Sequence, residues 1–152
     1  MSFSFDTSAL IEPWTRRYPP DVFPQIWQWL EYCIQEGTIS AVDEVRHEIL
    51  RQEDDLAAWA KTQAHLFAPA DEAVQQALRR VLEVFPNLAD HERDRSGADP
   101  WVVAHALANG LSVVTYETRG KQNKPKIPNA CDHFGVPCIS LVEVLRATGF
   151  KG

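Results

Sequence analysis

The sequence predicts an α/β fold in one domain, with a central, mostly parallel sheet flanked by helices. Short apolar runs typical of strands alternate with longer segments that carry apolar residues at helical spacing, and this order gives a parallel sheet. The chain has 152 residues, enough to bury a sizeable core. Its composition, 45% hydrophobic and 24% charged, is ordinary for a globular protein. We therefore treat residues 1–152 as one domain.

The first strand is expected at residues 2–5, where serine and phenylalanine alternate. A short helical piece follows at 9–11. Four prolines from residue 13 to residue 24 then predict a loop or a broken helix. Apolar residues at helical spacing predict the next helix over 22–35, with Gly37 as its stop.

The middle of the chain is expected to be mainly helical. Thr38-Ile39 is predicted to be a short strand, and Ser40 is a candidate cap for a helix whose first turns carry Asp43 and Glu44. Three further segments follow in order: helices over 55–65 and 71–84, and a polar loop over 86–98.

The last third begins with a helix that Asp99 opens, with Pro100 well tolerated in its first turn, and that Asn109-Gly110 ends. Residues 111–115 form the clearest strand of the chain. The remaining elements are expected in this order: a short helix over 130–134, a strand over 136–139, and a final helix over 141–146 that Ser140 caps.

The cysteines and the hydropathy pattern favour a cytoplasmic protein. Cys33, Cys131 and Cys138 are odd in number and scattered, so we expect core thiols in a reducing compartment. No apolar run approaches the ~20 residues that span a bilayer, and no basic region followed by an apolar stretch marks a secretion signal. The five histidines are scattered and lack the spacing of a zinc site.

Four acidic residues lie at strand ends or on helices that follow strands in this predicted order: Asp6, Glu48, Asp99 and Glu117. In open α/β folds, ligands gather at the carboxyl ends of the strands. Carboxylates that converge there repel one another unless a cation lies among them, and such oxygen ligands favour Mg²⁺ or Mn²⁺ over zinc. A metal held in this way suits phosphate chemistry. Our leading hypothesis is therefore a metal-dependent phosphodiesterase, and specifically a ribonuclease.

Each acidic residue also has a simpler interpretation. Asp6 and Asp99 could be helix caps, and Glu117 could be a surface residue after a strand. Glu48 lies beside apolar residues on a helix face, where it could form an ion pair with Arg51 or Arg46. Four acids at the same kind of topological position nevertheless make a shared site the better hypothesis.

Further residues are candidates for the same site. Glu44 lies one turn before Glu48 and is a second candidate ligand from that helix. The hydroxyl groups of Thr7, Ser8 and Thr115 could support a carboxylate, a metal-bound water or a phosphate. Satisfied hydroxyl groups at strand ends are an equally good interpretation.

The net charge of −6 counts against a nucleic-acid substrate, because proteins that bind nucleic acids usually carry a basic surface. Residues 119–126 soften this objection, since they contain four cations and no anion directly after Glu117: Arg119, Lys121, Lys124 and Lys126. We expect this loop to contact RNA phosphates, although most charge runs are merely solvated.

Four segments, in order and at matching spacing, resemble motifs of the PIN domain, the nuclease fold of the VapC toxins in toxin–antitoxin pairs. They are Phe5-Asp6-Thr7-Ser8, Val45-x-x-Glu48-Ile49, Asp99-x-x-Val102-Val103-Ala104-x-Ala106 and Val113-Val114-Thr115-x-Glu117. A likeness to the DUF4411 subfamily of PIN-like proteins covers nearly the whole chain. It includes the segments Trp27-x-Trp29-Leu30, Leu56-Ala57-x-Trp59-Ala60-Lys61 and Ala98-Asp99-Pro100-Trp101.

This resemblance implies a PIN-like fold and a Mg²⁺- or Mn²⁺-dependent endoribonuclease whose products carry 5′-phosphate and 3′-hydroxyl ends. It also implies a toxin whose cognate antitoxin fills the acidic groove, often with an arginine, and it leaves a homodimer open. Two residues depart from the family pattern, because Ser8 stands where many relatives have Asn and Glu117 where many have Asp. The alternative from another functional class is a catalytically silent PIN-like module that serves as a binding or scaffold partner.

Overall fold

The strands form one sheet in the order β3-β2-β1-β4-β5, and every neighbouring pair is parallel. The computed structural model describes residues 1–88 and 97–152. Its strands are Phe3–Phe5 (β1), Ile39–Val42 (β2), Phe67–Ala68 (β3), Ser112–Val114 (β4) and Cys138–Ile139 (β5). From β1 in the middle, the chain builds one half of the sheet through β2 and β3 and the other half through β4 and β5. The predicted α/β class with a parallel sheet is confirmed.

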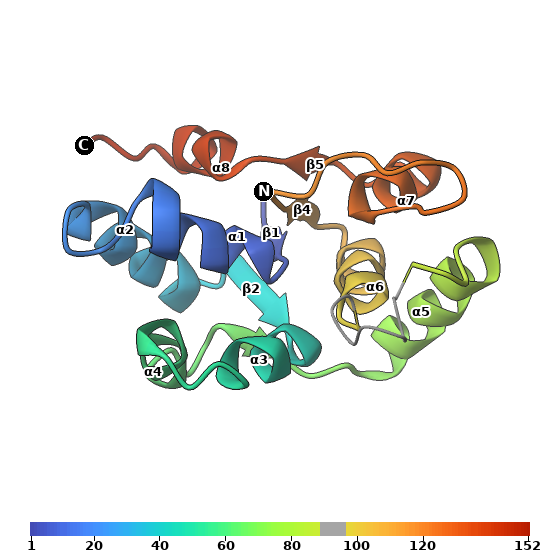
Figure 1. Cartoon of the computed structure of the whole chain (residues 1–152), viewed down its shortest axis with the longest axis horizontal. Coiled ribbons are helices and arrows are strands. Elements are labelled where there is room, and N and C mark those ends of the chain that lie inside the picture. Colours follow the sequence, from blue (N-terminus) through green and yellow to red (C-terminus); the bar gives the residue numbers. More distant parts are fainter. Residues whose placement is uncertain (89–96) are drawn as a thin grey trace.

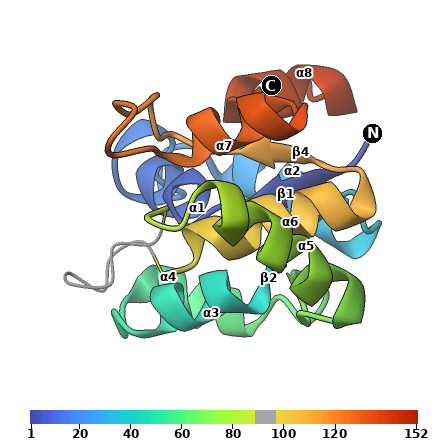
Figure 2. The same cartoon turned by 90° about the vertical axis from the view of Figure 1, so that its right-hand side faces the viewer.

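Helices cover both faces of this sheet (Figures 1 and 2). They are α1 (Ser8–Glu12), the π-helix η1 (Pro13–Arg17), α2 (Pro24–Gln35), α3 (Asp43–Leu50), α4 (Asp55–Lys61), α5 (Glu72–Val84), α6 (Asp99–Asn109), α7 (Ile127–Phe134) and α8 (Leu141–Thr148). Figure 1 shows α2 on one side of the sheet and α6, backed by α5, on the other. Among the helices of the described ranges, none has the length and apolar character of a membrane-spanning segment.

The middle strand is buried on both faces, as expected for a strand between two layers of helices. Phe3, Ser4 and Phe5 are each exposed by 1% or less. The polar member of this strand is satisfied, because the Ser4 hydroxyl lies 2.8 Å from Nδ1 of buried His105 on α6. Burial also lowers the pKa of His105, so this histidine is a neutral core residue.

The proline-rich segment after α1 begins with the π-helix η1, and this part packs through a cluster of tryptophans. Trp14 of η1 contacts Trp27 of α2, with ring centroids 4.8 Å apart, and Trp59 of α4, at 5.7 Å. Trp27 and Trp59 lie 5.1 Å apart, and the indole N–H of Trp27 donates to the carbonyl oxygen of Tyr18 at 2.7 Å. The chain that directly follows the first acidic residue is thereby fixed against two other helices.

Several element predictions were wrong in detail. Ser40 does not cap α3, because it lies inside β2, paired in register with Ser4, and Val42 occupies the cap position. The two-residue strand β3 was not predicted, since it is defined only by its pairing with β2. Helix α7 begins at Ile127 rather than at residue 130, and α4 ends at Lys61.

The prediction of three core thiols was only partly right. Cys33 and Cys131 are buried, but Cys138 is exposed because it lies on β5, an edge strand of the sheet. Within residues 1–88 and 97–152, no group of three His, Cys, Asp or Glu side chains is placed to hold a metal ion as the side chains lie. His91 and most of the predicted loop 86–98 lie outside the described residues.

Candidate active site

The four acidic residues of the predicted site line one cavity of about 320 Å³, which we call the acidic cavity. Asp6 follows β1, Glu48 is on the helix after β2, Asp99 opens α6 and Glu117 follows β4. Neighbouring strands β1 and β4 are parallel, and the chain leaves them toward opposite halves of the sheet. This is the topological switch point at which α/β folds bind ligands.

Asp6 is almost fully buried, with 2% of its surface exposed. Its carboxylate accepts hydrogen bonds from the Ser8 hydroxyl at 2.6 Å, the Thr115 hydroxyl at 2.5 Å and the backbone N–H of Ala9 at 3.0 Å. Burial raises the pKa of Asp6 to about 6, and the charge of Glu117 adds to this, while the hydrogen bonds act in the opposite direction. The bond from Ala9 is of the capping type, so Asp6 has a structural role besides its place in the cavity.

Asp99 is the first residue of α6 rather than its cap, and Ala98 at the cap position offers no side-chain hydrogen bond. Burial raises the pKa of Asp99 well above its usual range, and the nearby charges of Glu117, Asp6 and Glu48 raise it further. A hydrogen bond between the Asp99 and Glu117 carboxyl groups acts in the same direction. Asp99 therefore holds a proton when no cation is bound, and Glu117 accepts it in a hydrogen bond.

Glu48 points into the acidic cavity, and its Oε1 accepts a hydrogen bond from the Thr7 hydroxyl at 2.5 Å. Glu44, one turn earlier on α3, is not among the residues that line the cavity and lies 3.6 Å from Nδ1 of His47. Arg51 lines the acidic cavity and brings a positive charge close to these carboxylates.

Hydroxyl groups connect the segments that follow β1 and β4. The Ser8 hydroxyl, which donates to Asp6, also accepts from the backbone N–H of Tyr116 at 2.9 Å. The Thr115 hydroxyl likewise accepts from the N–H of Glu117 at 3.0 Å. All three predicted supporting residues, Thr7, Ser8 and Thr115, therefore hold an acidic residue or the chain beside it.

The donor set of the acidic cavity fits a hard divalent cation, because it offers carboxylate and hydroxyl oxygens without sulfur or imidazole. Burial raises the pKa of Asp6 and Asp99, and repulsion from neighbouring carboxylates raises it further; a cation would offset both effects. The described side chains do not form a group of three ligands as they lie, and the Asp99 and Glu117 carboxyl groups share a hydrogen bond.

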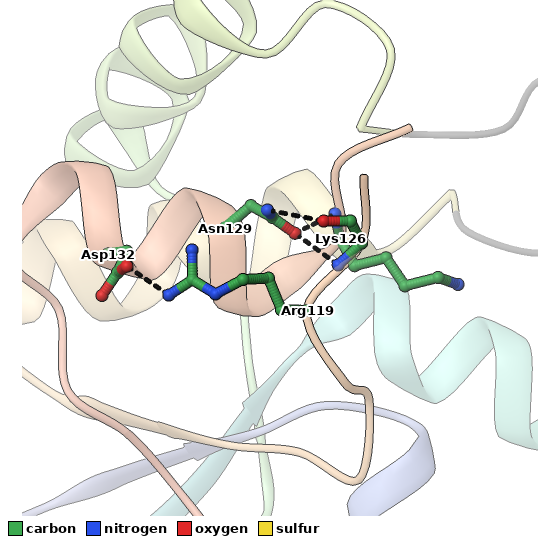
Figure 3. A network of polar contacts seen from close by, with 5 residues as sticks. Arg119, Lys126, Asn129 and Asp132 are labelled. Carbon is green, nitrogen blue, oxygen red and sulfur yellow. Dashed lines mark hydrogen bonds and ion pairs between the residues drawn. The ribbon is translucent and has the colours of Figure 1, made fainter. Parts of the chain in front are cut away.

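The predicted basic loop, residues 119–126, is folded back on itself and held by one asparagine (Figure 3). Oδ1 of Asn129 accepts from the backbone N–H groups of Gly120, at 2.8 Å, and Lys126, at 2.9 Å. Its Nδ2 donates to the carbonyl oxygen of Gly120 at 3.1 Å. The chain is so tight here that a Cβ at Gly120 would collide with the carbonyl oxygen of Lys124.

The cations of this loop differ in their surroundings. Arg119 forms an exposed ion pair with Asp132 of α7 (Figure 3). Lys121 and Lys124 face each other across a bridge, in which the N–H of Lys124 donates to the carbonyl oxygen of Lys121 at 2.9 Å. Their side chains and that of Lys126 are exposed. The loop thus presents three lysines next to the segment that carries Glu117.

The model of one protein family matches residues 3–152 of this sequence. The chain belongs to the DUF4411 family. This family is described as a domain of unknown function, and membership confirms the resemblance drawn from the sequence motifs. No curated protein matches the DUF4411 chain significantly in sequence.

Two solved structures resemble the DUF4411 chain. One is the crystal structure of VapBC2 from Rickettsia felis bound to a DNA fragment from their promoter. It is 13% identical, with a TM-score of 0.53 and coverage of 92% of this chain and 98% of that chain. The other is FitAcB from Neisseria gonorrhoeae, 18% identical, with a TM-score of 0.48 and coverage of 90% and 96%. At such low identity, the similarity to VapBC2 shows a shared fold and nothing more. The fold is PIN-like, as predicted.

Sequence reasoning missed two residues that organise the surroundings of the site in this DUF4411 chain. Asn129 holds the basic loop, and Asp132 pairs with Arg119. A signal for Asn129 was present, because it lies three residues after Lys126 at the start of a helix, where an amide side chain can accept from the cap N–H. Asp132 gave no such signal, because its partner Arg119 lies outside the helix of Asp132, on the preceding loop.

Proposed function

We propose that this protein is a metal-dependent endoribonuclease and the toxin of a toxin–antitoxin pair. The observation that supports the enzyme best is the acidic cavity, where carboxylates from four separate segments meet and where burial, together with neighbouring negative charge, raises the pKa of Asp6 and Asp99. Such an arrangement destabilises a protein without a cation, and strongly perturbed pKa values in a cavity are typical of functional sites. The PIN-like fold and the motif resemblance support a nuclease as the kind of enzyme.

In this proposal Asp6, Glu48, Asp99 and Glu117 hold one or two Mg²⁺ or Mn²⁺ ions, and Glu44 stays outside. When bound, the cation supplies an activated water at neutral pH and stabilises negative charge on the phosphate. The protein's own part is to position the ligands: the Ser8 and Thr115 hydroxyls fix both oxygens of Asp6, and Thr7 fixes Glu48. Asp99 would hold the ion in its ionised form, because a nearby cation lowers the pKa of a carboxyl group.

The direct test is cleavage of a 5′-labelled single-stranded RNA with Mn²⁺, with Mg²⁺ and with EDTA. We expect cleavage inside the strand with either metal, products that carry 5′-phosphate ends, and no cleavage in EDTA. Thermal stability should rise with Mn²⁺, because a ligand that binds only the folded state stabilises it. An RNA that stays intact, together with thermal stability that does not respond to Mn²⁺, would favour the silent binding module instead.

The lysines of the basic loop are proposed to contact the RNA backbone. Changing Lys121 and Lys124 to glutamine together should weaken binding equally for all sequences, because phosphate contacts carry no sequence information. The slope of log affinity against log salt should flatten by about 0.7 for each lost contact with a single strand. Fluorescence anisotropy at several salt concentrations measures both effects.

The control is a charge-matched double variant, Lys61→Gln with Lys151→Gln, which removes two exposed cations from other parts of the chain. It should leave affinity and slope close to wild type. Equal effects from the two double variants would mean that the loop contributes only to the overall charge, and the net charge of −6 would then argue against an RNA substrate.

The proposed partner is an antitoxin that covers the acidic cavity with a basic side chain, since arginine binds carboxylates through two parallel hydrogen bonds. VapBC2, which has a similar fold, was crystallised bound to a DNA fragment from the promoter of its own pair. The genes beside the one that encodes this chain can test this part. A small adjacent reading frame whose product binds this protein and stops RNA cleavage would support it, and a product without effect would count against it.

A further inference from the structure

Two further cavities follow the acidic cavity, each sharing lining residues with the one before it. The second, of about 500 Å³, shares Glu117 with the acidic cavity. The third, of about 420 Å³, shares Arg119 and Asp132 with the second, and we call it the aromatic cavity. Each of the three cavities therefore shares lining residues with the next. Their order runs from the carboxylates of the acidic cavity to the aromatic cavity.

Two rings from different helices form one wall of the aromatic cavity. Phe85 follows α5 and His133 is on α7, and their ring centroids lie 5.5 Å apart, edge to face. Behind them, Phe134 lies 4.8 Å from His133 and 6.1 Å from Phe85. His133 is exposed, whereas both phenylalanines are half-buried. The imidazole ring is thus supported by the protein and still open to a ligand.

The polar lining of the aromatic cavity is close to neutral. Arg119 and Asp132 both line it and neutralise each other in their ion pair. The amide of Asn129 is already used by the backbone of the basic loop. Gln122 is exposed and has no hydrogen bond to the described part of the chain, so its amide is available to a ligand.

We propose that the aromatic cavity binds one base of a single-stranded RNA whose backbone reaches the acidic cavity. This proposal rests on the proposed ribonuclease function and adds a base-binding site to it. A base offers a flat face to the ring of His133 and a hydrogen-bonding edge to Gln122. A phosphate group would instead meet Asp132, and a purely apolar ligand would leave Gln122 without a partner. A duplex does not fit, because its bases stack on one another.

The test is an abasic scan of the RNA combined with variants of His133. A fluorescein-labelled oligoadenylate and versions with one abasic site at successive positions are bound to the full chain in Ca²⁺, with anisotropy as the readout. For the wild type we expect one position at which loss of the base weakens binding about tenfold. His133→Ala should weaken the intact strand by a similar factor and remove the effect of that position. His133→Phe should restore both, because any aromatic ring can stack.

His65→Ala is the matched control, since His65 is exposed and lines none of the three cavities. It should bind like the wild type. If His133→Ala binds the intact strand normally, or keeps the same position effect, the base site is overturned even though the protein cleaves RNA. If the wild type neither binds nor cleaves RNA with Mn²⁺, the proposed function fails, and the base site fails with it.

Discussion

Asp99→Asn is expected to abolish RNA cleavage while the protein stays folded. Activity should fall by more than about a hundredfold, because even residues that only orient a metal ligand account for ten- to a hundredfold. The fold should survive, since Asp99 does not cap α6 and an Asn amide can still donate to Glu117. Initial cleavage rates in Mn²⁺ and the circular dichroism spectrum measure the two effects.

The same variant should change how stability depends on pH in the absence of metal. Both Asp6 and Asp99 have a pKa above the usual value, so the folded state binds more protons than the unfolded state above about pH 4. The free energy of unfolding of the wild type should therefore fall as pH rises through about 6 and beyond. In Asp99→Asn one of these groups no longer ionises. The variant should match the wild type near pH 4 and be more stable than it at pH 8, with a difference that grows as the pH rises.

Urea unfolding in EDTA across this pH range measures the difference directly. Mn²⁺ should reverse the order at pH 8, because the wild type gains stability from the ion and the variant gains much less. A variant that is less stable than the wild type at every pH, with normal activity per folded molecule, would show that Asp99 is structural and that the site is wrongly assigned.

Glu48→Gln and Glu44→Gln should have very different effects although they are the same substitution one turn apart. Glu48 lines the acidic cavity and Glu44 lies beside His47 outside it. We expect Glu48→Gln to reduce cleavage by about a hundredfold or more and to raise the Mn²⁺ concentration needed for half-maximal rate. Its amide oxygen still accepts from Thr7, so the helix should keep its position. Glu44→Gln should stay within about threefold of the wild type, as most surface changes do.

Each member of this pair serves as the control for the other, because helix, charge change and side-chain volume are matched. Equal losses would mean that both carboxylates act on the metal. A larger loss for Glu44→Gln would mean that the motif on α3 is displaced by one turn from the assignment made here.

The acidic residues were predictable because each belongs to a local pattern. A strand that ends in a carboxylate, as at Asp6, or a carboxylate just past a strand, as at Glu117, is visible in a short window of sequence. The carboxyl ends of parallel strands lie at the same edge of a sheet. The acidic residues that follow these strands are therefore expected to lie close together from the fold class alone. Between Glu44 and Glu48, which lie one turn apart on the same helix, the motif favours Glu48, and the structure adds that Glu48 lines the acidic cavity while Glu44 does not.

Features that depend on pairing between distant segments could not be predicted in this way. Serine is a favoured residue at helix caps, but Ser40 lies in β2, where the backbone pairs with β1 beside Ser4. The ion pair of Arg119 with Asp132 and the rings around His133 depend on how α7 packs against α5 and the basic loop. Local propensity carries no information on such contacts, and tertiary context overrides it.

The central place of β1 has a consequence for the order in which the chain can fold during synthesis. Strand β1 leaves the ribosome before its partner β4, which follows more than a hundred residues later, since Asp6 and Thr115 are 109 positions apart. Until β4 is made, β1 has one free edge, and exposed edges are prone to pair with other chains. Contacts between such distant residues also slow folding. The acidic cavity is therefore assembled only after the chain has been translated as far as Glu117, because Glu117 is one of its lining residues.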